Sequence, residues 1–222
     1  MTITLKHEHA WTVTPDQARE IQARLRPLVV LSDGLTGVRA VAGLDVGFRG
    51  DRARAAAVVF SYPGLEQLGS ALAECPVTFP YVPGLLTFRE GPAALAALGR
   101  LTIAWDLLLC DGQGYAHPRR LGLASHLGVL LDRPSVGCAK SRLVGSHAEP
   151  EQAPGSWTPL VADGEVVGAA LRTRRGAKPV YVSVGHRVDL ASAIELVLGC
   201  TRQHRLPEPA RRAHQLASGR ES

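Results

Sequence analysis

Two aspartates stand in or directly after apolar runs of the sequence. Asp45 lies inside the segment Gly43–Phe48, and Asp111 follows Leu107–Cys110. A carboxylate inside an apolar strand costs several kcal/mol in desolvation unless it is paired with a base or bound to a metal. Asp45 alone fits a basic partner and a metal equally well. Asp111 leads into a glycine-rich stretch, whose backbone can approach a ligand closely.

A third acid, Glu90, has two interpretations. Thr87–Glu90 matches the T-x-x-E capping box, which would make Glu90 a helix cap. Pro92, however, fits best at the first position of a helix, and a helix that begins there leaves Glu90 free. We favour this later start.

Carboxylates that converge at strand ends suit Mg²⁺, which takes oxygen ligands, keeps waters and binds substrate phosphate. Such an ion can orient and deprotonate water and can neutralise charge during phosphodiester hydrolysis. Lys140 follows one apolar segment and His186 follows another, and both could assist this chemistry. For either residue alone, a structural or surface role is the more common one.

Composition excludes several classes of protein. The chain has 222 residues, of which 45% are hydrophobic and 20% charged, as in ordinary globular proteins. This length fits a single domain spanning residues 1–222. The N-terminal ten residues carry charge without an apolar signal region, and no apolar run approaches the roughly 20 residues of a membrane span. We therefore expect a soluble, cytoplasmic protein.

The cysteines and the charge distribution add two expectations. The four cysteines are widely spaced without a CxxC pair, so they are best interpreted as small hydrophobic residues. Residues 1–111 contain 10 basic and 11 acidic residues, whereas residues 112–222 contain 15 basic and 9 acidic ones. A basic half suits a polyanion such as nucleic acid, although many proteins are mildly basic for no specific reason.

Hydrophobic periodicity predicts three strands first and then alternating helices and strands. The order predicts an α/β fold with a mixed central β-sheet flanked by helices. Helices are expected at 14–30, from after Gly84 to about 101, at 118–131 with Pro118 first, at 189–199 and after Pro207. Strands are expected up to about 48, at 55–62, 66–77, 105–112 and 134–140, and near 166–173 and 180–184, with a loop at 150–159.

Six segments in order resemble successive motifs of the endonuclease V family. They are VAGLDVGF, PYVPGLLTFREGP, DLLLCDGQGYAHPRRLGLASHLG, SVGCAKSRLVG, VYVSVGHRVDL and RLPEPARRAH, and they extend over residues 40–215. Each segment alone is a weak signal, but their joint order is specific. The resemblance implies a ribonuclease H-like fold.

The resemblance also implies roles for individual residues. Asp45, Glu90 and Asp111 would form an acidic site for Mg²⁺, or for Mn²⁺ in its place, and His186 would complete it. Lys140 would lie near the scissile phosphate.

Around this centre the resemblance implies a nucleic-acid interface. Tyr81, in a loop with Pro80, would be a wedge that separates the strands, and His117 would make supporting contacts. Without the resemblance, a Tyr81 folded onto the core is the simpler interpretation of this proline-rich turn. A base pocket would be bordered by Gly84, Leu85, Gly112 and Leu143.

The activity implied is a nick in DNA at the second phosphodiester bond 3′ to deoxyinosine, the product of adenine deamination. One alternative is an endoribonuclease of the same fold that acts on inosine in RNA, and the sequence does not decide whether a 2′-hydroxyl is read. Another is a non-catalytic nucleic-acid-binding module, which would not need the three acids. One departure is Gln113, where the family commonly has histidine; glutamine forms hydrogen bonds but carries no proton at neutral pH.

Overall fold

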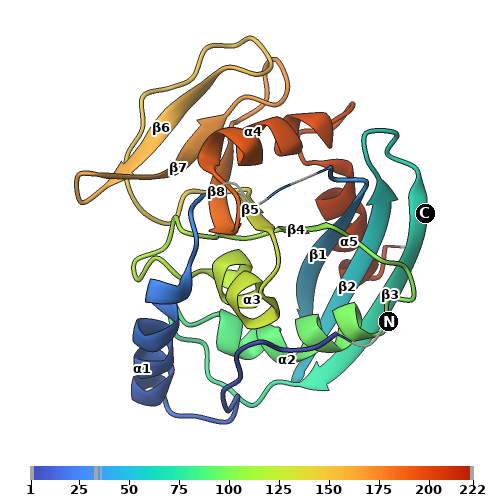
Figure 1. Ribbon diagram of the computed structural model, residues 1–222, viewed down its shortest axis with the longest axis vertical. Coiled ribbons are helices and arrows are strands. Elements are labelled where there is room, and N and C mark those ends of the chain that lie inside the picture. Colours follow the sequence, from blue (N-terminus) through green and yellow to red (C-terminus); the bar gives the residue numbers. More distant parts are fainter. Residues whose placement is uncertain (1–2, 33–34, 36, 221–222) are drawn as a thin grey trace.

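One mixed sheet of eight strands forms the centre of the computed structural model, which describes residues 3–32, 35 and 37–220 (Figure 1). The strand order is β3-β2-β1-β4-β5-β8-β7-β6. The strands are β1 Ala40–Arg49, β2 Arg52–Ser61, β3 Gln67–Pro76, β4 Leu107–Cys110, β5 Ser135–Ala139, β6 Trp157–Ala162, β7 Glu165–Leu171 and β8 Val180–His186. The predicted α/β fold with a mixed sheet and flanking helices is confirmed.

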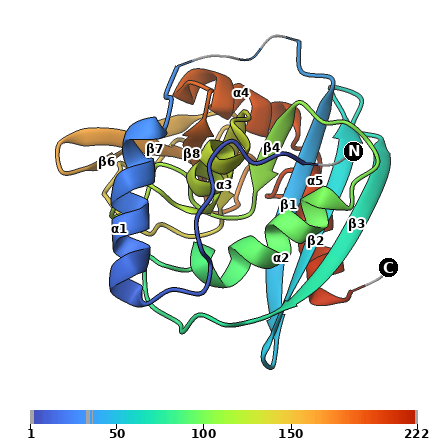
Figure 2. The ribbon, with the colours of Figure 1, turned by 60° about the horizontal axis from the view of Figure 1, so that its bottom comes forward.

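Helices cover both faces of this sheet. They are α1 Pro15–Leu25, which continues into the 3-10 turn Arg26–Leu28, α2 Thr87–Gly99, α3 Leu123–Leu131, α4 Leu190–Gly199 and α5 Glu208–Ser218. Figure 2 shows α2 and α5 on opposite sides of β1 to β3. The two faces follow from strand alternation: Ala42 and Leu44 pack in a core with α2 and α3, whereas Val41 packs in a core with α4.

The central strand pair fixes where the two aspartates stand. β1 and β4 are parallel, with Leu44 opposite Cys110, and the Asp111 N–H donates to the Leu44 carbonyl at 2.9 Å. Asp45 and Asp111 are the next residue on each strand, so they stand beside each other just beyond this pair. Asp45 alternates with Leu44, so it belongs to the opposite face from the α2–α3 core.

Three boundaries differ from the sequence expectations. α2 begins at Thr87 and contains Pro92, so the later start was wrong. Phe88 packs in a buried cluster with Phe79, and this burial stabilises the helix ahead of the proline. α3 begins at Leu123 rather than at Pro118, and the expected loop at 150–159 ends in the edge strand β6.

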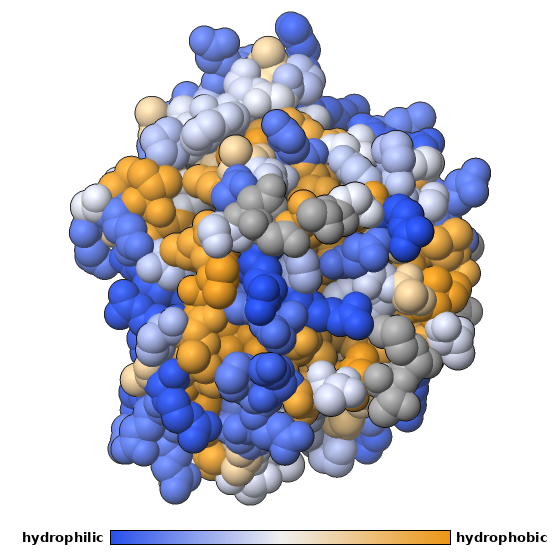
Figure 3. Space-filling view, viewed as in Figure 1, coloured by the Kyte–Doolittle hydropathy of each residue, from blue (hydrophilic) through white to orange (hydrophobic). Residues whose placement is uncertain are grey.

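An apolar groove lies between β7 and the segment that follows α1. Its lining includes Leu31, Val166, Val167 and Leu190. Apolar side chains gather on this side of the face seen in Figure 3. Among the described residues that line this groove, none is acidic. Among the described helices, none has the length and apolar character needed to cross a membrane.

The contact of α5 with β1 gives a prediction for folding. A Cβ atom added at Gly43 would lie 2.2 Å from the Pro209 backbone, so Gly43→Ala must push the start of α5 off the sheet. We expect a loss of about 1–3 kcal/mol in the free energy of unfolding, measured by urea denaturation. Gly99→Ala is the control, because its added Cβ meets only ordinary contact distances of 3.5 Å or more. Equal stability of the two variants would contradict this tight contact.

Candidate active site

Asp45, Asp111 and His214 meet at one end of the central strands. The Asp45 carboxylate oxygen Oδ2 lies 2.7 Å from His214 Nδ1, and Asp111 Oδ2 lies 4.0 Å from the same nitrogen. One ligand atom from each residue falls within 4.8 Å of the others. Two carboxylates and an imidazole at these separations form a donor set that could hold a metal ion.

The sequence missed His214, which comes from α5. Its helix presents Ala210, Ala213 and Ala217 to the sheet, and all three are buried. His214 lies four residues after Ala210 and three before Ala217, so it shares their side of the helix. A histidine in this register with the apolar positions, at the end of the RLPEPARRAH motif, was the available signal.

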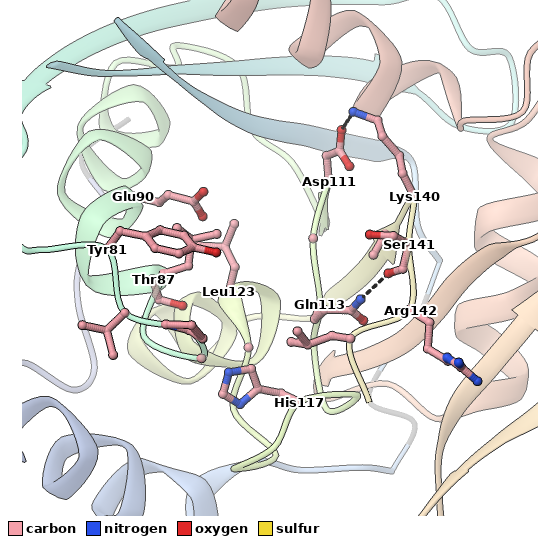
Figure 4. Close-up of a pocket in the computed structure, with 18 residues that line it drawn as sticks. Tyr81, Thr87, Glu90, Asp111, Gln113, His117, Leu123, Lys140, Ser141 and Arg142 are labelled. Atoms are coloured by element: carbon pink, nitrogen blue, oxygen red, sulfur yellow. Dashed lines mark hydrogen bonds and ion pairs between the residues drawn. The ribbon is translucent and has the colours of Figure 1, made fainter. Parts of the chain in front are cut away.

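Lys140 joins the cluster from the chain that follows β5. Its Nζ atom lies 2.5 Å from Asp111 Oδ2 (Figure 4). The same atom lies 3.3 Å from His214 Nδ1. The Lys140 carbonyl accepts a 2.6 Å hydrogen bond from Arg205, which anchors this part of the loop. The structure therefore brings Lys140 to the carboxylates; its place near the scissile phosphate stays a prediction.

Glu90 approaches from α2, across the cavity from Asp111 (Figure 4). Burial, together with the charges of Asp45 and Asp111, raises the pKa of Glu90 to about 8. Burial also raises the pKa of Asp111, as does Asp45, while Lys140 and His214 act in the opposite direction. The capping-box role is absent, since no side chain caps this helix. The raised pKa values of Glu90 and Asp111, to which neighbouring carboxylates contribute, mark a concentration of negative charge that a cation would relieve.

Beside the acids, a cavity of about 360 Å³ opens between α2 and the loop after β5. Of the predicted interface residues, Tyr81, Gly84, Gly112, His117 and Leu143 line it. Tyr81 is 70% exposed, so it is not folded onto the core. Two predicted residues are not part of the lining.

Those two residues are Leu85 and Pro80. Leu85 is fully buried and packs with Ala18, Phe79 and Phe88, so its assignment to the rim of the pocket was wrong. An apolar side chain beside the core gains more from burial than from facing an open cavity. Pro80 is exposed and precedes Tyr81.

Two polar residues shape the cavity wall. Gln113, at the position where the family commonly has histidine, donates from its side-chain nitrogen to the Ser141 carbonyl at 2.9 Å. This bond links the loop after β4 to the loop after β5. Burial and the nearby Arg119 lower the pKa of His117 to about 4, so this ring is neutral at neutral pH.

The structure does not bring His186 to the cluster. Its Nε2 lies 3.3 Å from Asp132, and its Nδ1 accepts from the Val30 N–H at 3.2 Å. The reason is strand direction: β8 is antiparallel to β5, so His186 pairs with Ser135 at the start of β5, while Lys140 follows its end. The expectation that His186 completes the acidic site was therefore wrong.

The raised pKa of Glu90 makes stability depend on pH. Its folded-state pKa of about 8 exceeds the ordinary value of 4.5, so between these pH values the folded state binds the extra proton. The free energy of unfolding of the metal-free protein should therefore fall as pH rises through this window. Glu90→Gln should remove part of the slope and be more stable than wild type at pH 8, by about 1 kcal/mol or more.

Chemical denaturation in chelator at a series of pH values measures this effect. Glu20→Gln, at an exposed glutamate of α1, is the matched control and should keep the wild-type slope. If Glu90→Gln also keeps that slope, Glu90 does not carry the raised pKa.

A family sequence model, a curated relative and a solved structure all match this chain over most of its length. The sequence model of the family described as Endonuclease V matches residues 23–215. Endonuclease V of Roseiflexus castenholzii is 56% identical over 211 residues, which cover 95% of each chain. The crystal structure of endonuclease V from Streptomyces avermitilis is similar with a TM-score of 0.90 and 45% identity, over 99% of this chain and 97% of that one.

A third relative was solved with nucleic acid. Endonuclease V of Ciona intestinalis, in complex with a 23mer DNA containing an inosine followed by a ribo-adenosine, is similar with a TM-score of 0.79 and 29% identity, over 93% of this chain and 98% of that one. The predicted ribonuclease H-like arrangement is confirmed by these similarities. With this sheet, this acidic cluster and these relatives, the chain belongs to the endonuclease V family.

Proposed function

We propose that this protein is a metal-dependent endonuclease that nicks DNA at the second phosphodiester bond 3′ to deoxyinosine. The observation that carries the proposal is the meeting of Asp45, Asp111, His214 and Lys140 beside a cavity with an exposed tyrosine at its rim. The Ciona relative, whose structure contains inosine in DNA, supports the substrate. The presence of all three acids argues against a non-catalytic binding module.

Mg²⁺, or Mn²⁺ in its place, is the ion we propose for the acidic site. Asp45 and Asp111 would hold it, with His214 beside them and Glu90 across the cavity. Oxygen-rich donor sets favour these hard ions, and the imidazole is compatible with Mn²⁺. When bound, the ion supplies a polarised water and neutralises the charge that develops on the phosphate.

Lys140 has a separate task in this proposal. Its ammonium group is paired with Asp111 and is 37% exposed, so it can reach a phosphate that enters the site. A cation fixed beside the scissile phosphate stabilises the additional negative charge of the transition state. Since the group is held by an ion pair and by the anchored loop, little rearrangement is needed when substrate binds.

The cavity is suited to an extruded base. Enzymes that read a single base in a duplex take it out of the stack and fill the gap with a side chain. Tyr81 projects at the rim and would fill the gap, while the base would enter between Gly84, Gly112 and Leu143. Hypoxanthine carries an oxygen where adenine has an amino group, so a fixed backbone N–H that donates to that oxygen excludes adenine.

The central prediction is that the acidic site is needed for cleavage and not for nucleic-acid binding. Asp45→Asn keeps the shape of the side chain and removes the charge that holds the ion. We expect the single-turnover cleavage rate of a labelled deoxyinosine oligonucleotide to fall by about 1000-fold or more, while its Kd changes little. Matched DNA and RNA strands in the same assay determine whether a 2′-hydroxyl is read.

Asp51→Asn is the control, because Asp51 is exposed at the hairpin between β1 and β2. Its cleavage rate should equal that of wild type. An Asp45→Asn protein that nicks at the wild-type rate, or a wild-type protein that cuts without divalent metal, would refute the proposal.

A second prediction concerns Tyr81. Stacking of an aromatic side chain on a base contributes about 1–3 kcal/mol, and a wedge acts only where a stack must be opened. Tyr81→Ala should therefore weaken binding to a deoxyinosine duplex by about tenfold or more, and binding to the single strand much less. Electrophoretic mobility shifts of both substrates measure this difference. Equal losses would mean that Tyr81 only shapes the loop.

A further inference from the structure

The wall of the cavity beside Tyr81 is a tight turn over Val82–Leu85. The Leu85 N–H donates to the Val82 carbonyl at 2.9 Å, and Gly84 has a φ of +76°. Proline at the second position and a positive φ at the third are the features of a type II turn. Within the described part of the chain, no residue accepts a hydrogen bond from the Gly84 N–H, and Pro83 and Gly84 both line the cavity.

The Gly84 backbone contacts His117, which lines the cavity, and also two side chains that do not line it. The Gly84 carbonyl accepts from Gln22 Nε2 at 3.1 Å and from Arg119 Nη2 at 2.6 Å. Arg119 Nε in turn donates to Gln22 Oε1, and Gln22 Nε2 also lies 3.3 Å from the Leu121 carbonyl. Both the nitrogen and the oxygen of the Gln22 side-chain amide are thus engaged in hydrogen bonds.

Gln22 occupies a buried position of α1, where an apolar residue is usual. It is fully buried on α1, on the same side as Ala18 and Leu25. A buried amide costs stability unless all its groups are satisfied, so leucine would serve packing alone equally well. Its partners are the turn and an arginine, which indicates that the amide fixes the position of Gly84. The matched family region begins at residue 23, so Gln22 lies just outside it.

We propose that Gln22 and Arg119 are positioning residues for base selection: by binding the Gly84 carbonyl they fix the turn Val82–Leu85, so that the N–H of Gly84 in this turn stays directed at an extruded base. This inference rests on the proposed function, since it concerns the pocket of that reaction. A turn held by an arginine and a buried amide that are also hydrogen-bonded to each other does not reorient when a base carries an amino group instead of an oxygen. Adenine then leaves the fixed donor unpaired, and inosine does not.

The test compares binding and cleavage of single strands that differ only in one base. Wild type, Gln22→Leu, Arg119→Met and Arg119→Lys are measured with central inosine and central adenine, for Kd without metal and for single-turnover rate with Mg²⁺. Arg24→Met is the control, because Arg24 is an exposed arginine of α1. Arg119→Lys keeps the charge and serves if the other variants fold poorly, as judged by thermal unfolding.

We expect the inosine-to-adenine preference to fall on the order of tenfold in Gln22→Leu and Arg119→Met, by loss of inosine binding. The Mg²⁺ concentration for half-maximal rate should stay unchanged, and Arg24→Met should match wild type. An unchanged preference in folded variants, or an equal loss for both bases, overturns the inference. If the wild type itself does not cut inosine, the proposed function fails first, and the two failures are therefore distinguishable.

Discussion

Asp45 on β1 and Asp111, directly after β4, carry like charges. Each is the next residue after the last paired residues of these two parallel strands, Leu44 and Cys110. Two buried carboxylates this close repel each other: burial first, and then the charge of Asp45, raise the pKa of Asp111. The fold places two basic partners beside them, Lys140 after β5 and His214 on α5, whereas Glu90 on α2 adds a third acid. The packing of α5 against β1, through the close approach at Gly43, is what delivers the histidine. The arrangement of the site therefore depends on how this charge pair is compensated.

The same strand ends also explain why the base cavity lies beside the acids. The loops after β4 and β5 carry Gln113 and Ser141, which are joined by a hydrogen bond, and they form one wall of the cavity. The turn at Gly84 precedes α2, whose first turn carries Glu90, and it forms the opposite wall. A base held between these walls, as we propose, would place its own backbone beside the carboxylates. Recognition and chemistry would then use the two sides of the same loops.

Sequence reasoning found the parts whose signal is local. Apolar runs in the sequence identified β1 and β4. Asp45, which interrupts the first run, and Asp111, which follows the second, stood out as the polar residues. It failed where tertiary pairing decides. His186 follows an apolar strand just as Lys140 does, and only the antiparallel direction of β8 puts it at the other end of the sheet. His214 lies on a short amphipathic helix far along the chain, and its contact with Asp45 requires knowledge of how α5 docks. Pro92 suggested that the helix begins at this proline, but the burial of Phe88 stabilises an earlier start, at Thr87.

We propose that Asp45 of β1 and Asp111 after β4 form a cation site. Crystals grown with Mn²⁺ can show the ion itself, because anomalous difference density locates it without reference to activity. We expect a peak in contact with the carboxylates of Asp45 and Asp111, next to His214, and loss of that peak in Asp45→Asn. A peak at His186 and Asp132, or none at the strand ends in well-ordered crystals saturated with Mn²⁺, would contradict it.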